Sequence, residues 1–157
     1  MKKSLLVSVA VGVAVLFAAG LYAGTTVPDS VKMECKGYEK HTKGIVEFSH
    51  KKHAEDYAAK APELYKDGCG VCHHNDKGEA LKDLKAGDDV KNCFECHKKP
   101  GEKPKGKDAP KLDKKGELEY HAEAIHENCK GCHKEYNTKT GKKDAPETCA
   151  KCHPKSE

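Results

Sequence analysis

Four copies of one five-residue motif, Cys-x-x-Cys-His, occur between residues 69 and 153. Two thiols at this spacing can form thioether bonds with the two vinyl groups of a single haem, and the histidine that follows then lies under the ring and ligates the iron. The motifs therefore predict four covalently bound haem c groups. The attachment cysteines are Cys69, Cys72, Cys93, Cys96, Cys129, Cys132, Cys149 and Cys152, and the histidines that follow them are His73, His97, His133 and His153.

Repetition is what makes this signal specific. A single Cys-x-x-Cys pair also occurs in zinc sites and in thiol redox motifs. Here every pair is followed by His, in a chain with only 10 His among 157 residues. Zinc does not require a His directly after each second Cys. We therefore favour haem attachment and keep two alternatives, a zinc-binding structural module and a scaffold of four short disulfides.

Six histidines remain for the opposite faces of the irons: His41, His50, His53, His74, His121 and His126. Met33 is the only methionine after residue 23, so ligation by His and Met can serve at most one haem. We therefore expect each haem to be ligated by two histidines. Such ligation lowers the reduction potential relative to His and Met and leaves no open position on the iron.

His50 and His53 lie three residues apart, so on a helix they share one broad face and can reach two haems. His74 directly follows His73. Neighbouring helical residues point about 100° apart, so these two rings can ligate different haems.

His121 and His126 would face different sides of one helix, so we expect only one of them to be a ligand. Helical side-chain direction favours His126. His41, in the polar segment before residue 47, is expected to be a bystander. The expected metal ligands are therefore His50, His53, His73, His74, His97, His126, His133 and His153.

The composition leaves little material for a protein core. Residues 24–157 contain 14 Leu, Ile, Val and Phe, too few to offset the entropy lost on folding. Four flat, apolar macrocycles would supply the missing core. We expect a mainly α fold with long loops and at most a short N-terminal β-ribbon, organised around the haems, and a largely unfolded apo-protein.

The elements that would position the ligands are short. The pattern predicts a ribbon at residues 31–34 and 44–48, a helix at 50–60 capped by Ser49, a short helix at 79–86, an exposed loop at 98–116, a helix at 117–136 and a polar loop at 138–146. The irregular spacing of the four motifs suits one domain, residues 24–157, and not a tandem array.

Residues 1–23 resemble an export signal. Lys2 and Lys3 precede an apolar run from Leu5 to Ala23, followed by small residues. The run is also just long enough to span a bilayer, so an uncleaved membrane anchor is the alternative. Either way we expect the domain in the periplasm, and membrane contact only if the segment is not cleaved.

Charge argues against one class of partner. The chain has 29 Lys, no Arg and 25 Asp plus Glu. Its net charge of +4 falls by two units without Lys2 and Lys3. We therefore expect no binding to nucleic acid.

The sequence resembles the class III cytochromes c, the cytochromes c3 of sulfate-reducing bacteria, over residues 27–153. The residues that carry the resemblance are Val27-Pro28 through Lys32-Met33-Glu34, Val46-x-Phe48-x-His50-x-x-His53, Cys69-x-x-Cys72-His73-His74, and Tyr120-His121 through His126 ahead of Cys129. Many relatives have a longer Cys-x-x-x-x-Cys-His at the second and fourth sites, and Cys35 has no counterpart in the family pattern.

This resemblance implies the ligand pairs His50 with His73, His74 with His97, His53 with His133, and His126 with His153. It also implies that Phe48 lies between haems. A lysine-rich surface near the fourth haem would dock a redox partner, and its candidates are Lys130, Lys139, Lys142, Lys143 and Lys151.

The resulting expectation is a low-potential periplasmic electron carrier and not an enzyme. It would act between a hydrogenase or similar dehydrogenase and a membrane-bound electron-transfer complex. The alternative is a multihaem reductase of metal ions or small oxyanions, which would need an iron with an open position.

Overall fold

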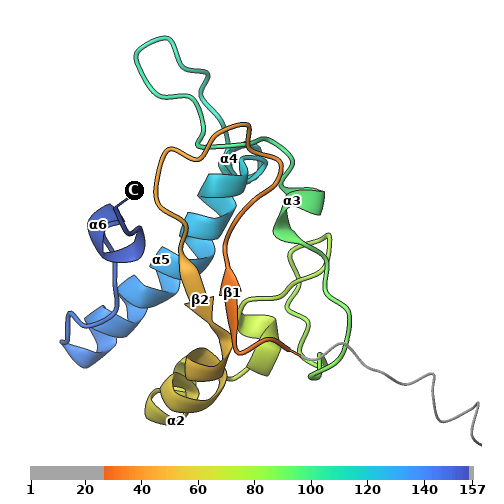
Figure 1. Cartoon of the computed structure of the whole chain (residues 1–157), viewed down its shortest axis with the longest axis vertical. Coiled ribbons are helices and arrows are strands. Elements are labelled where there is room, and N and C mark those ends of the chain that lie inside the picture. Colours follow the sequence, from red (N-terminus) through yellow and green to blue (C-terminus); the bar gives the residue numbers. More distant parts are fainter. Residues whose placement is uncertain (1–26, 156–157) are drawn as a thin grey trace, which may run out of the picture.

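The computed structural model describes residues 27–155 (Figure 1). The expected signal peptide or anchor at residues 1–23 lies outside this range. Within the described range, no helix has the length and apolar character needed to cross a membrane.

A short antiparallel ribbon joins β1 (Ser30–Lys32) to β2 (Glu47–Ser49), with Val31 opposite Phe48. The backbone N–H of Met33 extends the pairing by donating to the carbonyl of Val46 at 2.8 Å. The alternating apolar residues predicted this ribbon, and it is the sheet that the structure contains in residues 27–155. It ends where the helix that carries His50 and His53 begins.

That helix runs over residues 50–60, as expected, but its middle is wound more widely than an α-helix. Its π-helical part is η1 (Lys52–Tyr57), and α2 (Ala58–Lys60) completes it. The Ser49 hydroxyl accepts a hydrogen bond from the Lys52 backbone N–H at 3.2 Å, so the expected cap is present. The 3₁₀ turn η2 (Pro62–Leu64) follows.

Each Cys-x-x-Cys pair lies in a helical turn or at its end. The four turns are η3 (Gly68–Val71), α3 (Cys93–Cys96), the middle of α5 (His121–Thr140) and α6 (Cys149–Cys152). At α3 the local sequence specifies the start, because Asn92 and Glu95 form a capping box.

The helix expected at residues 117–136 is two helices, and that prediction was wrong at its start. α4 (Lys114–Leu118) begins at an Asp113 cap, and α5 begins only after Tyr120, whose backbone is extended. The break follows from a backbone bridge, since Lys99 N–H donates to Glu119 O at 3.0 Å and His121 N–H donates to Lys99 O at 2.8 Å. α5 then continues to Thr140 and ends at Gly141, which adopts φ 68°.

The short helix expected at residues 79–86 is absent from the structure, and turns occupy that stretch. Its backbone bonds to the first haem motif instead, because Leu81 N–H donates to His73 O at 3.0 Å. Asn75 stabilises the turn, because its side-chain oxygen accepts hydrogen bonds from the backbone N–H groups of Lys77 and Glu79.

The described residues contain almost no apolar core. Ala61, at 3% exposure, is the one hydrophobic residue in this range that is buried. In the view of Figure 1 the long helix α5 passes behind the ribbon, and the loop between α3 and α4 projects from the rest. The helix-rich fold with long loops matches the expectation, and its interior lacks the side chains that would normally fill it.

Candidate metal centres

Four pairs of imidazole rings face one another within residues 27–155, each joining a motif histidine to a histidine elsewhere. Their centroid separations and interplanar angles are 6.4 Å and 16° for pair 1 (His50 and His73), 5.9 Å and 72° for pair 2 (His74 and His97), 6.3 Å and 24° for pair 3 (His53 and His133), and 6.3 Å and 86° for pair 4 (His126 and His153). These are the pairs that the resemblance implied.

The spacing leaves room for one metal ion between the rings of each pair. Two metal–nitrogen bonds of about 2 Å and two ring radii of about 1 Å give a centroid separation of about 6 Å. Stacked imidazoles without a metal between them would approach more closely. The pairs therefore have the dimensions of axial ligands to one iron, while the ligand assignment itself stays a prediction.

In most of these histidines Nδ1, the ring nitrogen nearer the backbone, forms a hydrogen bond with a main-chain carbonyl. Each Nδ1 donates to a main-chain oxygen: His53 to Ser49 at 2.8 Å, His74 to Asn75 at 2.8 Å, His133 to Pro146 at 2.7 Å, His153 to Gly44 at 2.8 Å, and His97 to Leu118. A carbonyl only accepts, so Nδ1 carries the hydrogen and Nε2 keeps its lone pair. Such a bond fixes the tautomer and orientation of a ligating histidine.

Burial keeps two of the rings neutral. It lowers the pKa of His53, with His133 and His50 adding repulsion between positive charges. It also lowers the pKa of His73, with His50 and His74 as lesser causes. A neutral imidazole is the form that binds a metal.

His50 has a ring nitrogen that no group of the described polypeptide satisfies. Its Nδ1 atom is buried and has no hydrogen-bond partner. A buried polar atom without a partner is unfavourable. An iron at pair 1 would take the other nitrogen, Nε2, so His50 differs from the five histidines above in lacking a carbonyl that would fix its tautomer.

The nine cysteines all lie in the described range and are free thiols. The motif cysteines are exposed or half-buried, which suits attachment to a group placed outside the backbone turns. Burial among neighbouring sulfurs raises the pKa of Cys72 and brings that of Cys129 to about 11.

The two histidines outside the pairs share an aromatic cluster. Tyr38 stacks on His41 at 5.3 Å between ring centroids, and its hydroxyl is 3.0 Å from Nδ1 of His121. Phe94 contacts both Tyr38 and His121 edge-on. Sequence reasoning missed this cluster, although Phe94, an aromatic residue inside a haem motif, was an available signal. Of the alternatives His121 and His126, the structure brings His126 to His153.

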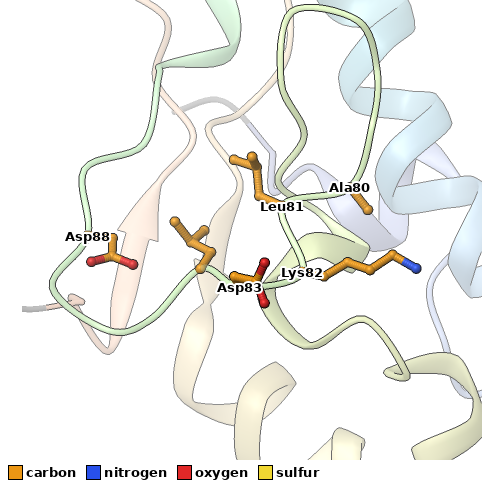
Figure 2. A pocket seen from close by; sticks show the side chains of 6 residues that line it. Ala80, Leu81, Lys82, Asp83 and Asp88 are labelled. Atoms are coloured by element: carbon orange, nitrogen blue, oxygen red, sulfur yellow. The ribbon is translucent and has the colours of Figure 1, made fainter.

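Two other features of the described residues indicate no functional site. No three side chains of His, Cys, Asp or Glu come together in a group that fits a metal ion, so the zinc interpretation finds no ligand set. A pocket of about 430 Å³ lies in the loop after the first motif. Figure 2 shows the side chains that line it, which are Ala80, Leu81, Lys82, Asp83, Leu84 and Asp88. Neither Cys nor His lines it.

Paired cysteines at helical turns, paired imidazoles and an interior with almost no apolar side chains together fit haem c. They define a small c-type cytochrome. The chain belongs to the class III cytochrome c family, whose model matches residues 27–153. Searches of curated proteins and of solved structures gave no significant match. As a member of this family the chain is a multihaem electron-carrier cytochrome with covalently bound haem c, and class III cytochromes are typically periplasmic.

Proposed function

We propose that this protein is a periplasmic, low-potential carrier with four haem c groups, each ligated by two histidines. The observation that supports this most strongly is the set of four imidazole pairs, each at 5.9–6.4 Å. When bound, the haems supply reversible one-electron chemistry at the iron.

The side chains have two roles in this proposal. The motif cysteines anchor each cofactor through two thioethers, so it stays bound in both oxidation states. The paired histidines would hold each iron from both sides, and such ligation would favour electron transfer over substrate binding and lower the potential. Carbonyl partners at Nδ1 hold the rings in place and raise their basicity as ligands.

The order of the pairs along the backbone suggests a route. His73 and His74 are adjacent, which places pairs 1 and 2 side by side. His50 and His53, one helical turn apart, join pairs 1 and 3. His126 and His133 lie on α5, and seven residues of helix span about 10 Å, so pairs 3 and 4 are also neighbours. The proposed sequence of centres is therefore 2, 1, 3, 4.

Lysines around the fourth motif provide the proposed docking surface. Lys130, Lys142, Lys143 and Lys151 are exposed, and Lys130 is close enough to Cys152 to lower its pKa against the dominant effect of burial. Lys139 belongs to the same surface but pairs with Glu135 at 2.6 Å. An acidic partner is expected here, such as a hydrogenase or a membrane-bound redox complex, steered by charge.

A redox titration of the purified holoprotein, followed in visible light, tests the proposal. Reduction in four one-electron steps, all at the low potentials typical of two-histidine ligation, supports it. For a carrier docked by charge, the rate at which the partner reduces it should also fall as ionic strength rises. Saturable turnover of nitrite or a metal ion, with carbon monoxide bound at one per molecule, would instead favour the reductase alternative.

A further inference from the structure

Tyr57 is an exposed aromatic residue in direct contact with an expected iron ligand. Its side chain is 41% exposed, one of three large apolar residues exposed in the described range, with Val27 and Val90. Its ring meets the ring of His53 at 5.1 Å and 89°, an edge-to-face contact. The two residues lie four positions apart within the π-helical η1, which puts them on one face.

His53 is thereby held from three directions. Phe48 lies 4.5 Å away at 36°, the Ser49 carbonyl accepts from Nδ1 at 2.8 Å, and Tyr57 meets the ring edge-on. His126 differs, because within residues 27–155 its ring contacts the ring of His153 alone, at 86°. Pair 3, whose distal ring is confined, is close to parallel at 24°.

We propose that Tyr57 is a positioning residue for His53. It limits rotation of the imidazole about the Cβ–Cγ bond and so sets the ligand-plane angle at pair 3. It also shields that edge of the ring from water. The inference rests on the proposed function, because it needs an iron between His53 and His133.

Two consequences follow for a variant that lacks the ring. The imidazole of His53 gains rotational freedom, and the angle between ligand planes changes, which alters how the iron d orbitals split. Water also reaches the site more easily. Because water stabilises the more highly charged oxidised form, the midpoint potential of that centre becomes more negative.

The chain offers a matched control. Tyr57 has the Lys60 ammonium 5.8 Å from its ring centroid, and Tyr120 has Lys99 at 5.1 Å in the same arrangement. Within residues 27–155 the ring of Tyr120 contacts no histidine ring. Tyr120→Ala therefore removes a tyrosine and a cation–π contact without touching a ligand pair.

The test compares full-chain holoproteins with Tyr57→Ala, Tyr57→Phe and Tyr120→Ala substitutions, by low-temperature EPR and redox titration. We expect Tyr57→Ala to shift one of the near-parallel low-spin signals and to move one midpoint potential negative. Tyr57→Phe, which keeps the edge contact, should restore both, and Tyr120→Ala should match the unmodified protein. If Tyr57→Ala does not mature, Tyr57→Leu makes the same comparison while keeping side-chain volume.

Superimposable spectra and potentials for Tyr57→Ala would overturn the positioning role, as would an equal change in Tyr57→Phe. Intact mass separates this failure from failure of the proposed function. Four haems with unchanged spectra in the variant refute only the role of Tyr57. Fewer than four haems in the unmodified protein, or no low-spin iron with near-parallel ligands, refute the four-haem assignment itself.

Discussion

His153 donates its Nδ1 hydrogen to the carbonyl oxygen of Gly44 at 2.8 Å, across 109 residues of sequence. Gly44 also packs against Pro154, because a Cβ atom at position 44 would collide with the Pro154 carbonyl oxygen. The segment before β2 and the last haem motif therefore fix each other. Pair 4 depends on a glycine that carries no haem chemistry of its own.

Gly44→Ala should consequently destabilise the holoprotein. The added methyl group meets backbone, which cannot move aside as a side-chain tip can, and overpacking of this kind costs about 1–3 kcal/mol. Thermal unfolding measures the loss. Gly116→Ala is the control, because its Cβ makes contacts of 3.1–3.5 Å to side chains only, and alanine favours the helix by roughly 0.5–1 kcal/mol. Equal melting temperatures for Gly44→Ala and the unmodified protein would argue against the packing at Pro154.

The choice between His126 and His121 gives a second prediction. His126→Ala should leave one iron with an open position, so the reduced variant should bind one equivalent of carbon monoxide. His121→Ala should bind none, because His121 contacts Tyr38 and Phe94 and not a motif histidine. Absorbance titration of the reduced proteins with carbon monoxide measures both. Binding by the His121 variant alone would reverse the assignment.

The candidate ligands could be named from the sequence because the chemistry that they indicate is local, whereas their pairing was implied by the family resemblance. Two thiols and an imidazole within five residues suffice to bind haem, so the motifs can be recognised from the sequence without knowledge of any tertiary contact. The distal candidates His50, His53 and His74 were also visible from their spacing. The supporting carbonyls were not, since Leu118 and Gly44 lie 21 and 109 residues from the histidines that they orient.

In the secondary structure, too, locally determined features were predictable and features that depend on distant contacts were not. Ser49 and the ribbon were predictable because caps and alternation act over a few residues. The break before α5 was not, because it depends on Lys99 pairing with Glu119 and His121. The helix expected at 79–86 failed for a similar reason, since Leu81 bonds back to His73. Composition and glycine positions do not encode such distant partners.

The haem-free polypeptide should not fold cooperatively. Ala61 is the one buried hydrophobic residue of the described range. Most ion pairs there join exposed side chains, where such pairs contribute little, and the pair of Lys103 with Glu117 is half-buried. Protein made without haem attachment should lack a sigmoidal thermal transition by circular dichroism, while the holoprotein should show one. A cooperative transition in both would show that the side chains alone provide a core.

Alkaline stability should depend on Tyr65. Burial, with lesser contributions from Cys132 and Cys72, raises the pKa of Tyr65 to about 12. Those sulfurs are neutral as thioethers, so burial is the cause that persists in the holoprotein. The folded state therefore favours the neutral phenol, and this stabilisation is complete below the ordinary tyrosine pKa of about 10 and is lost as pH rises above it.

Melting temperatures measured from pH 9 to pH 11.5 in the unmodified protein and in Tyr65→Phe check this sign. The unmodified protein should lose stability with pH more steeply than the variant, which has no phenol to ionise. Parallel curves would mean that Tyr65 titrates in the folded state as it does in the unfolded chain.

The most direct test of the whole account is the integrated low-temperature EPR spectrum of the fully oxidised, unmodified protein. Four facing imidazole pairs, two near-parallel at 16° and 24° and two near-perpendicular at 72° and 86°, predict four low-spin ferric irons per chain. Two should give rhombic signals, and two should give the strongly anisotropic signals of crossed ligand planes. A spectrum with high-spin iron, or one that integrates to fewer than four low-spin centres, would contradict the account.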